Sequence, residues 1–269
     1  MERVETGKNY VRYAMGRLGV IALRDGYVDM PSSRLRLTDG RAFGADLPAQ
    51  VDLVDGKLRL SVNAFLVVDG DRHVLIDTGA SNAWEPTMGV LLDALDEAGV
   101  ARESIATVAF THTHIDHVNG LVAADGSDAF PNLTRLLVPR EEIALFDAEE
   151  RLARFRSRRS PLDHGFALGD SVTAIRAHGH EIGHTAFEVT SAGETLVIWG
   201  DVVHVPSIQF ARPEIAWELD TDRDLARLTR LDLLRRAARE GLFVAGAHLD
   251  FPGVGTVTES AGAFGFAPL

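Results

Sequence analysis

The sequence predicts an α/β protein in which two mixed β-sheets pack face to face with helices on their outer sides. Apolar segments of strand length occur in two batches, one before residue 140 and one after residue 170. Segments with helical periodicity are interleaved with both batches, which is the pattern of sheets covered by helices. No linker, low-complexity segment or internal repeat divides the 269 residues, so we expect a single domain spanning residues 1–269.

The first batch opens with apolar residues on both sides of an Asp25-Gly26 pair. This pattern predicts a short hairpin over residues 19–30 that ends at Pro31. Residues 32–50 show little periodicity and are interpreted as a loop or short helix covering one edge. The other elements expected before residue 150 are strands at 57–68, 73–76, 106–110 and 134–138, a helix at 86–100 and a helix opened by Pro139.

The second batch contains the clearest helix of the sequence, over residues 222–240. Its predicted buried side follows apolar residues at helical spacing: Leu225, Leu228, Leu231, Leu234 and Ala238. Thr221 with Asp224 fits a capping box, and Gly241 fits a helix stop. The strands expected in this batch lie at 171–176, 185–189, 195–199 and 242–247.

Composition excludes several classes of function. The chain has 27 basic and 39 acidic residues, a net charge of −12, which argues against a nucleic-acid or anionic-membrane partner. It contains no cysteine, so any metal must be held by His, Asp or Glu. No apolar run is long enough to cross a bilayer, and residues 1–12 lack the apolar segment of a signal peptide. We therefore expect a cytoplasmic protein that acts on a small molecule, with a homodimer as an open alternative to a monomer.

Residues 111–120 are the strongest functional signal. His112, His114, Asp116 and His117 place four potential metal donors within six positions, directly after the apolar strand at 106–110. Alternate side chains of an extended chain point the same way, so His112 and His114 converge, and a helix starting just afterwards turns Asp116 and His117 toward the same point. Imidazoles and a carboxylate crowded together without a cation would be costly to desolvate. This spacing predicts metal binding.

Three further groups of donors follow predicted strands. They are His178-Gly-His180-Glu-Ile-Gly-His184 after residue 176, Gly200-Asp201 after 199, and His248-Leu-Asp250 after 247. Side chains that emerge at the ends of strands are the usual position for chemistry in α/β proteins. Imidazole and carboxylate donors suit zinc, manganese, cobalt or iron, and sequence does not choose among these metals.

The ligand motif His112-x-His114-x-Asp116-His117, with His184, Asp201 and His248, resembles the metallo-β-lactamase superfamily. That resemblance implies a four-layer αβ/βα sandwich with a dinuclear metal site at one edge. Flanking segments resemble one branch, the lactonases and organophosphate hydrolases related to methyl parathion hydrolase, among whose relatives are N-acyl-homoserine lactonases. These segments are Asn63–Leu66, Leu75–Gly79, Phe130–Asn132, Gly200–His204, Gln209-Phe210 and Ala247–Gly255.

The resemblance also implies a role for each donor. It assigns to one metal His112, His114 and His184, and to the second metal Asp116, His117 and His248. Asp201 would bridge the two ions, which the family pattern suggests are zinc. Asp77 would not bind metal but would orient a ligand histidine, and His180, which precedes the ligand histidine, is interpreted as structural.

The expected activity is hydrolysis of a lactone or ester, with phosphotriesters as secondary substrates. A hydroxide shared by two metals is the expected nucleophile, because metal binding lowers the pKa of water from about 15.7 to about 7. Asp201 would position both ions, and Asp116 could pass a proton to the leaving group. The residues expected to line the substrate pocket are Phe65, Trp84, Phe130, His204, Phe210 and Phe251, although each phenylalanine could instead fill the core between the sheets.

Two other functions remain open at this stage. A glyoxalase II-like thioester hydrolase would be expected to gather basic residues around its substrate's carboxylates. Residues 151–159 contain five arginines, which form either a solvated surface or a lid that admits an anionic substrate. A non-catalytic sensor of a metal or small ligand would be expected to have a broken donor set, whereas here every position is filled.

Overall fold

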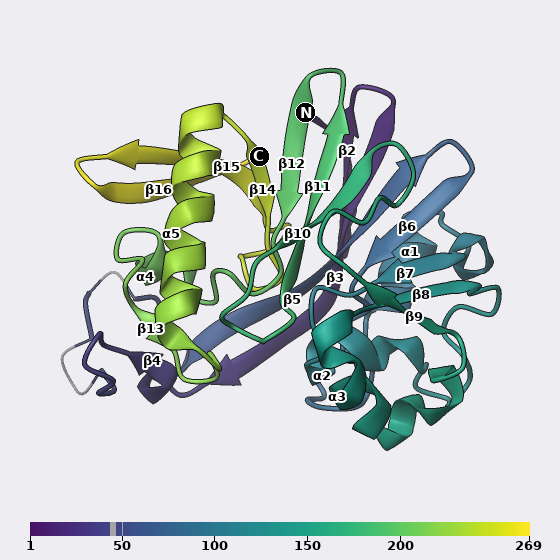
Figure 1. The fold of residues 1–269 in the computed structure, drawn as a ribbon, viewed down its shortest axis with the longest axis horizontal. Coiled ribbons are helices and arrows are strands. Elements are labelled where there is room, and N and C mark those ends of the chain that lie inside the picture. The colour runs from purple at the N-terminus through teal and green to yellow at the C-terminus, as the bar shows by residue number, and fades with distance from the viewer. Residues whose placement is uncertain (44–46, 50) are drawn as a thin grey trace.

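The computed structural model describes residues 1–43, 47–49 and 51–269. Two large sheets pack against each other, and the helices lie on their outer sides (Figure 1). Apolar side chains from both sheets form one shared core between them, which includes Tyr13, Phe65, Leu137, Phe187 and Ala245. The predicted α/β architecture with two sheets face to face is confirmed.

The first sheet has eight strands among the described residues, in the order β1-β2-β3-β5-β6-β7-β8-β9. Their bounds are β1 (Glu2–Thr6), β2 (Tyr10–Met15), β3 (Leu18–Met30), β5 (Leu58–Asp69), β6 (Arg72–Ile76), β7 (Thr107–Ala109), β8 (Arg135–Pro139) and β9 (Arg159–Leu162). Neighbouring strands are antiparallel from β1 to β6 and parallel from β6 to β9. The sheet is therefore mixed, as predicted.

The second sheet has six described strands, in the order β10-β11-β12-β14-β15-β16. Their bounds are β10 (Val172–Arg176), β11 (Thr185–Ser191), β12 (Glu194–Ile198), β14 (Phe243–Ala245), β15 (Val254–Ser260) and β16 (Ala263–Pro268). Only β12 and β14 run parallel within it. A small antiparallel pair, β4 (Leu35–Arg36) with β13 (Ala216–Trp217), lies beside the large sheets.

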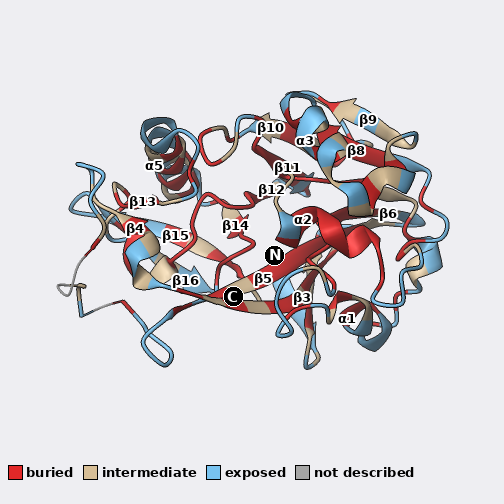
Figure 2. Ribbon diagram, turned by 90° about the horizontal axis from the view of Figure 1, so that it is seen from below, coloured by how far each residue is buried: buried red, intermediate tan, exposed pale blue. Residues whose placement is uncertain are grey.

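The helices cover the outer faces of the sheets. Their bounds are α1 (Leu91–Glu97), α2 (Ile115–Val118), α3 (Ile143–Ala148), α4 (Pro206–Gln209) and α5 (Arg223–Glu240). Buried residues of α1, α2 and α3 join one outer core with the first sheet, and α5 packs on the second sheet (Figures 1 and 2). Within the described ranges, no helix is long and apolar enough to cross a bilayer.

The segment 19–30 is one continuous strand and not the predicted hairpin. At Asp25 the register of β3 against β5 shifts between Arg24 and Gly26, which is the signature of a β-bulge. The Asp25 side chain is fully buried, and its carboxylate accepts the backbone N–H groups of Ala80 and Leu91 at 2.8 and 3.3 Å. The Asp-Gly pair therefore anchors a neighbouring loop instead of reversing the chain.

Helix α5 confirms the strongest helix prediction but buries a different side. Asp222 caps it by accepting the N–H of Leu225, in place of Thr221, and Gly241 ends it in the left-handed conformation, as predicted. Leu225 and Leu228 are 40% and 53% exposed. Its buried residues are Ala226, Arg230, Leu233, Leu234 and Ala237.

A buried arginine explains this rotation of α5. Arg230 is 1% exposed, and its guanidinium donates to the backbone carbonyl oxygens of Val202, Pro213 and Ile215 at 2.6 to 2.9 Å. A prediction from hydrophobic spacing leaves a charged residue on the solvent-exposed side of the helix. These carbonyl groups instead make a buried position favourable for Arg230, because they accept hydrogen bonds from its guanidinium.

Other sequence predictions differ in extent. The helix expected at 86–100 is confined to Leu91–Glu97, and seven strands were not predicted: β1, β2, β4, β9, β13, β15 and β16. In the segment 32–50, the described part holds a 3₁₀ turn at Ser32–Arg34 and strand β4, while residues 44–46 and 50 lie outside the described residues.

Candidate metal centre

Loops that follow strands of both sheets meet at one edge of the sandwich. The segment after β7 carries His112 to His117, and the loop between β10 and β11 carries His180. Asp201 and His248 follow the parallel strands β12 and β14, whose carboxyl ends lie at the same edge of the second sheet. Residues far apart in the sequence are thereby brought together.

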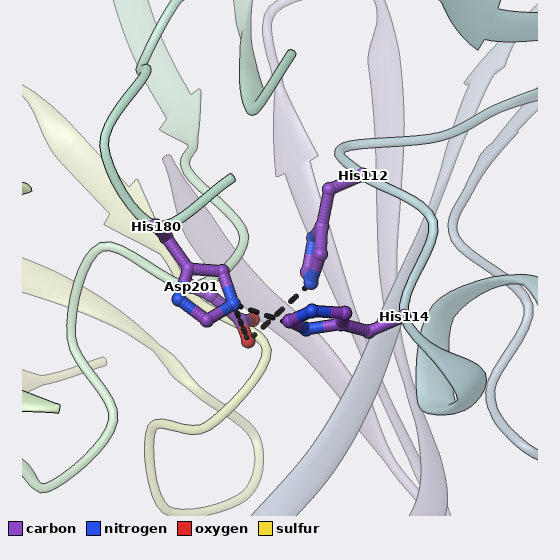
Figure 3. Close-up of side chains that lie close together, drawn as sticks. All are labelled: His112, His114, His180 and Asp201. Atoms are coloured by element: carbon purple, nitrogen blue, oxygen red, sulfur yellow. Dashed lines mark hydrogen bonds and ion pairs between the residues drawn. The ribbon is translucent and has the colours of Figure 1, made fainter. Parts of the chain in front are cut away.

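The first donor group consists of His112, His114, His180 and Asp201 (Figure 3). One donor atom from each residue lies within 4.8 Å of the others. Nε2 of His180 is 3.4 Å from Oδ2 of Asp201 and 3.2 Å from Nδ1 of His114. Nε2 of His112 is 3.7 Å from the same carboxylate oxygen. Three imidazoles and a carboxylate at these separations are a fitting donor set for one divalent cation.

The second donor group consists of Asp116, His117 and His248. Asp201 contacts this group as well, because its Oδ1 is 3.3 Å from Nε2 of His117 and its Oδ2 is 3.0 Å from Nε2 of His248. Nε2 of His248 also lies 3.6 Å from Oδ2 of Asp116. One buried carboxylate therefore stands between two sets of donors, the position that a bridging ligand requires.

The outward ring nitrogens of these histidines are held by protein groups. The contacts are His112 Nδ1 with Thr111 Oγ1 (3.1 Å), His114 Nε2 with Glu181 Oε1 (2.9 Å), His117 Nδ1 with Asp77 Oδ2 (2.9 Å), His180 Nδ1 with Asp220 Oδ1 (3.0 Å) and His248 Nδ1 with Ser61 O (2.7 Å). Such partners fix the orientation of a metal-binding imidazole and leave its other nitrogen facing inward.

Several of the inward atoms are buried and have no partner. In the described part of the chain, Nε2 of His112, Nε2 of His117 and Oδ1 of Asp201 make no hydrogen bond. Buried polar atoms are normally satisfied, so atoms left unpaired at the centre of a donor cluster need an explanation. The residues present therefore fit the pair of cations that the sequence motif predicts.

The histidines of the cluster differ in the direction in which their pKa values are shifted. Burial, together with the neighbouring His117, lowers the pKa of His112 well below its ordinary value, and burial does the same for His180. Burial would also lower the pKa of His117, but Asp201 and Asp77 raise it well above the ordinary value. His112 and His180 are thus neutral imidazoles, the form that binds a metal.

Asp77 lies where the resemblance predicted it. Besides contacting His117, its carboxylate accepts the backbone N–H and the hydroxyl of Thr111, each at 2.8 Å. It therefore fixes the segment that enters the donor motif as well as one of the rings in that motif.

The structure places His180, and not His184, in the first donor group. Nδ1 of His184 donates to the carbonyl oxygen of Ala177 at 2.7 Å, and its Nε2 accepts the backbone N–H of Asp201 at 3.1 Å. Both ring nitrogens are thus used in fixing the backbone. His180 lies in the middle of the loop and reaches the cluster, whereas His184 immediately precedes β11 and is buried in the core.

Comparison with protein families matches residues 58–248 to the metallo-beta-lactamase superfamily. The chain belongs to this superfamily. The family predicted from the ligand motif is therefore confirmed, as is its four-layer αβ/βα sandwich. A search of curated proteins finds no match to the sequence.

Several solved structures resemble the chain over nearly its whole length. The hydrolase AbOPH is 29% identical, with 98% of this chain and 99% of that chain covered and a TM-score of 0.83. AidC, a dizinc quorum-quenching lactonase, is 24% identical over 97% of both chains, with a TM-score of 0.84. A probable metal-dependent hydrolase from Staphylococcus aureus is 17% identical over 96% and 99%, with a TM-score of 0.77. The family, the hydrolase AbOPH and the cluster of His and Asp donors together support a metal-dependent hydrolase.

A cavity of about 350 Å³ opens onto both donor groups of this metallo-beta-lactamase site. Trp84 and His204 line it, as predicted. Its apolar wall was not predicted and consists of Val28, Met30, Leu60, Ile115, Trp217 and Leu219. These residues come from β3, β5, α2 and the chain around β13, and their convergence leaves no signal in the local sequence.

The phenylalanines predicted to line the pocket do not line this cavity. Phe65 belongs to the core between the sheets, Phe130 to the core beneath α1–α3, and Phe210 to the core beneath α5. Phe210 stacks on Phe266 with ring centroids 5.1 Å apart. Phe251 is half-buried and packs at the edge of the central core. The alternative stated for each phenylalanine, a position in the core between the sheets, is correct for Phe65. Phe130 and Phe210 are also core residues, but they lie in the outer cores between a sheet and its helices, where burial of the ring is equally favourable.

His204 is placed between the cavity wall and the donors. Its ring stacks on Trp217 at 5.1 Å and on His248 at 5.3 Å, and its Nε2 is 3.3 Å from Oδ2 of Asp201. Both of its ring nitrogens are buried and lack a hydrogen-bond partner among the described residues. Burial lowers the pKa of His204 to about 3, so the ring is neutral and offers one N–H and one lone pair.

The arginines of residues 151–159 do not form a lid. Their partners are Asn82 and Val122 for Arg151, Gly126 and Asp128 for Arg154, Glu150 for Arg156, Asp128 for Arg158 and Asp147 for Arg159. None of the five lines the cavity. The interpretation of this run as surface is the one that the structure supports.

Proposed function

We propose that the chain is a dinuclear metal-dependent hydrolase of a lactone or ester that carries an apolar acyl group. The observation that carries this proposal is the joining of two donor groups by Asp201 at the floor of a cavity with an apolar wall. The neighbours AbOPH, a hydrolase, and AidC, a quorum-quenching lactonase, support the same class of reaction.

The residues assigned to the metals follow from the two donor groups. His112, His114 and His180 would hold one cation, Asp116, His117 and His248 would hold the other, and Asp201 would contact both. Zinc is the proposed metal, and the donor set also suits manganese, cobalt or iron. Two such cations, when bound, would supply a hydroxide nucleophile near neutral pH and polarise the carbonyl oxygen of the substrate.

The chain itself contributes groups that handle the substrate. Asp116 lines the cavity, and its carboxylate can accept the proton that the attacking water loses and pass it to the oxygen of the leaving alcohol. The neutral ring of His204 can donate an N–H to a substrate oxygen that enters between Trp217 and Asp201. Met30 and Leu60 offer an apolar surface to the acyl chain and exclude water from the reacting carbonyl.

The alternatives fit the cavity less well. A glyoxalase II-like enzyme would need cationic side chains for the carboxylates of its thioester, and none of the described residues that line this cavity is Lys or Arg. A non-catalytic sensor is disfavoured because both donor groups are complete. Phosphotriester hydrolysis is proposed as a secondary activity of the same centre. The expected absence of nucleic-acid and membrane partners, the cytoplasmic location, the single domain and the open homodimer remain predictions.

Metal content and hydrolysis measured on the same preparation test this proposal. We expect two divalent ions per chain and turnover of N-decanoyl-homoserine lactone or an aryl ester, with slower hydrolysis of paraoxon. Chelation should abolish all of these activities, and zinc should restore them. Metal-loaded protein that hydrolyses a glutathione thioester alone, or none of these substrates, would refute the proposed activity.

A further inference from the structure

A buried carboxylate outside both donor groups connects the loops that carry them. Glu142 ends the 3₁₀ turn Arg140–Glu142 after β8, and its exposed fraction is 0%. Its Oε2 accepts the backbone N–H of Thr113 at 2.7 Å and the hydroxyl of Thr113 at 2.9 Å. Its Oε1 accepts the backbone N–H of Gly183 at 3.0 Å. Each carboxylate oxygen therefore holds a different loop.

The two residues bonded by Glu142 belong to the two segments that carry the histidines of the first donor group. Thr113 stands between His112 and His114, and Gly183 lies in the loop that carries His180. The approach to Gly183 is tight, because a Cβ atom there would lie 3.0 Å from Cγ and from Oε1 of Glu142. The segments that carry the three histidines of the first donor group are thus tied to a single side chain, which among the described residues hydrogen-bonds none of these histidines.

We propose that Glu142 is a positioning residue that sets the separation between the His112–His114 pair and His180, and thereby the affinity of the first site for its cation. This inference rests on the proposed metal centre and adds a residue that no local motif contains. A buried carboxylate is costly to desolvate, and three hydrogen-bond donors from the two loops compensate for it.

Replacement of Glu142 with glutamine tests the proposal with little change in shape. A carboxamide has one accepting oxygen, so its NH₂ group must face either the N–H of Thr113 or that of Gly183. One loop therefore loses its bond and meets a repelling donor. Loss of a direct outer partner of a metal ligand typically costs about 10- to 100-fold in affinity. Glu142 bonds the loops and not the histidines, so we expect the lower end of this range, a rise of about 10-fold in the Kd of the first site for Zn²⁺.

Asp25 provides a matched control. It is equally buried and also accepts backbone N–H groups with both oxygens, but these belong to Ala80 and Leu91 and not to either donor loop. The change Asp25→Asn is therefore chemically the same as Glu142→Gln at a different place. We expect it to leave the Zn²⁺ affinity of the first site at the wild-type value, whatever its effect on the melting temperature of the metal-free protein.

A second variant keeps the test decisive if Glu142→Gln does not fold. Thr113→Val removes the hydroxyl bond to Glu142 and retains the backbone N–H bond at nearly the same volume. We expect a smaller rise in the same Kd, about threefold, as for the loss of one hydrogen bond.

The measurements are calorimetric titration of Zn²⁺ into the metal-free proteins, their melting temperatures, and the visible spectrum after Co²⁺ binding. The spectrum reports the geometry around the ion, which a purely structural role of Glu142 would leave unchanged. A weaker site and altered spectrum in Glu142→Gln, with wild-type values in Asp25→Asn, would support the proposal. Wild-type affinity in Glu142→Gln, or in Thr113→Val if the first variant is unfolded, would overturn it, as would equal weakening in Asp25→Asn.

The same experiment distinguishes failure of the proposed metal centre from failure of the proposed role of Glu142. If the wild-type protein bound no zinc or cobalt, the metal centre itself would be refuted, and the role of Glu142 with it. If the wild-type protein bound two ions and Glu142→Gln bound them equally well, only the positioning role would be lost.

Discussion

Two alanine substitutions four residues apart should have opposite consequences, because one histidine faces the donor cluster and the other faces the backbone. His180→Ala removes a neutral imidazole whose Nε2 lies 3.4 Å from Asp201. His184→Ala removes a ring that bonds the carbonyl oxygen of Ala177 and the N–H of Asp201. The first change should therefore affect metal binding, and the second should affect folding stability.

The expected size of each effect follows from the contacts that the substitution removes. His184→Ala leaves two buried backbone groups without partners at about 1–3 kcal/mol each, so the free energy of unfolding should fall by about 2–6 kcal/mol. For a chain of this size, that corresponds to a melting temperature lower by about 4–12 °C. His180→Ala removes a donor itself, so its metal affinity should fall by more than the about 10- to 100-fold expected for an outer partner.

Metal analysis after dialysis, calorimetric Zn²⁺ titration and thermal unfolding of both metal-free variants separate the two outcomes. We expect His184→Ala to retain two ions per chain with a lowered melting temperature, and His180→Ala to retain at most one ion. Loss of a metal from His184→Ala alone, with two tightly bound ions in His180→Ala, would refute the assignment made from the geometry.

Three further predictions concern the cavity, the core and a buried carboxyl group. Trp84→Ala should lower kcat/KM for a decanoyl lactone about 10-fold more than for a short-chain lactone, because the indole lines the cavity. An equal loss of kcat/KM on both lactones would show that Trp84 does not contact the acyl chain. Phe210→Ala should lower the free energy of unfolding by about 3–5 kcal/mol in urea titrations and leave the ratio of kcat/KM values unchanged; an altered ratio would contradict its core position. Burial raises the pKa of Asp25 from 3.8 to about 7. Between these two pH values the folded chain keeps a proton on Asp25 that the unfolded chain has lost. The free energy of unfolding of the wild type therefore decreases as the pH rises through this range. Relative to the wild type, the free energy of unfolding of Asp25→Asn should therefore rise by about 1.4 kcal/mol per pH unit across that range. A pH-independent difference between the two proteins in urea titrations would show that the pKa of the Asp25 carboxyl group is not raised.

The secondary structure was predictable where a single local pattern decided it. Strands β5, β6, β8, β11 and β12 follow apolar runs bounded by turns, and they occur where the sequence predicts them. At Asp25-Gly26 the local turn signal was misleading, because Ala80 and Leu91 satisfy the Asp25 carboxylate from another part of the chain. In α5, the carbonyl groups that bond Arg230 likewise come from residues outside the helix.

The sequence by itself determined that this chain carries a metal-binding motif. His112, His114, Asp116 and His117 are close in sequence, and the geometry of an extended segment followed by a helical turn brings them together whatever surrounds them. The superfamily followed from the same few residues, and the family match over residues 58–248 confirmed it.

The tertiary structure decided everything that depends on contacts between distant segments. The choice between His180 and His184 depends on which ring meets Asp201 through its side chain and which meets the backbone of that residue. The apolar wall around Trp217 and the link made by Glu142 likewise join segments whose spacing in the sequence carries no periodicity. Local patterns record only which residues are able to bind a metal or bury a ring. Packing of the two sheets selects the ones that do, because only packing fixes which side chains face one another.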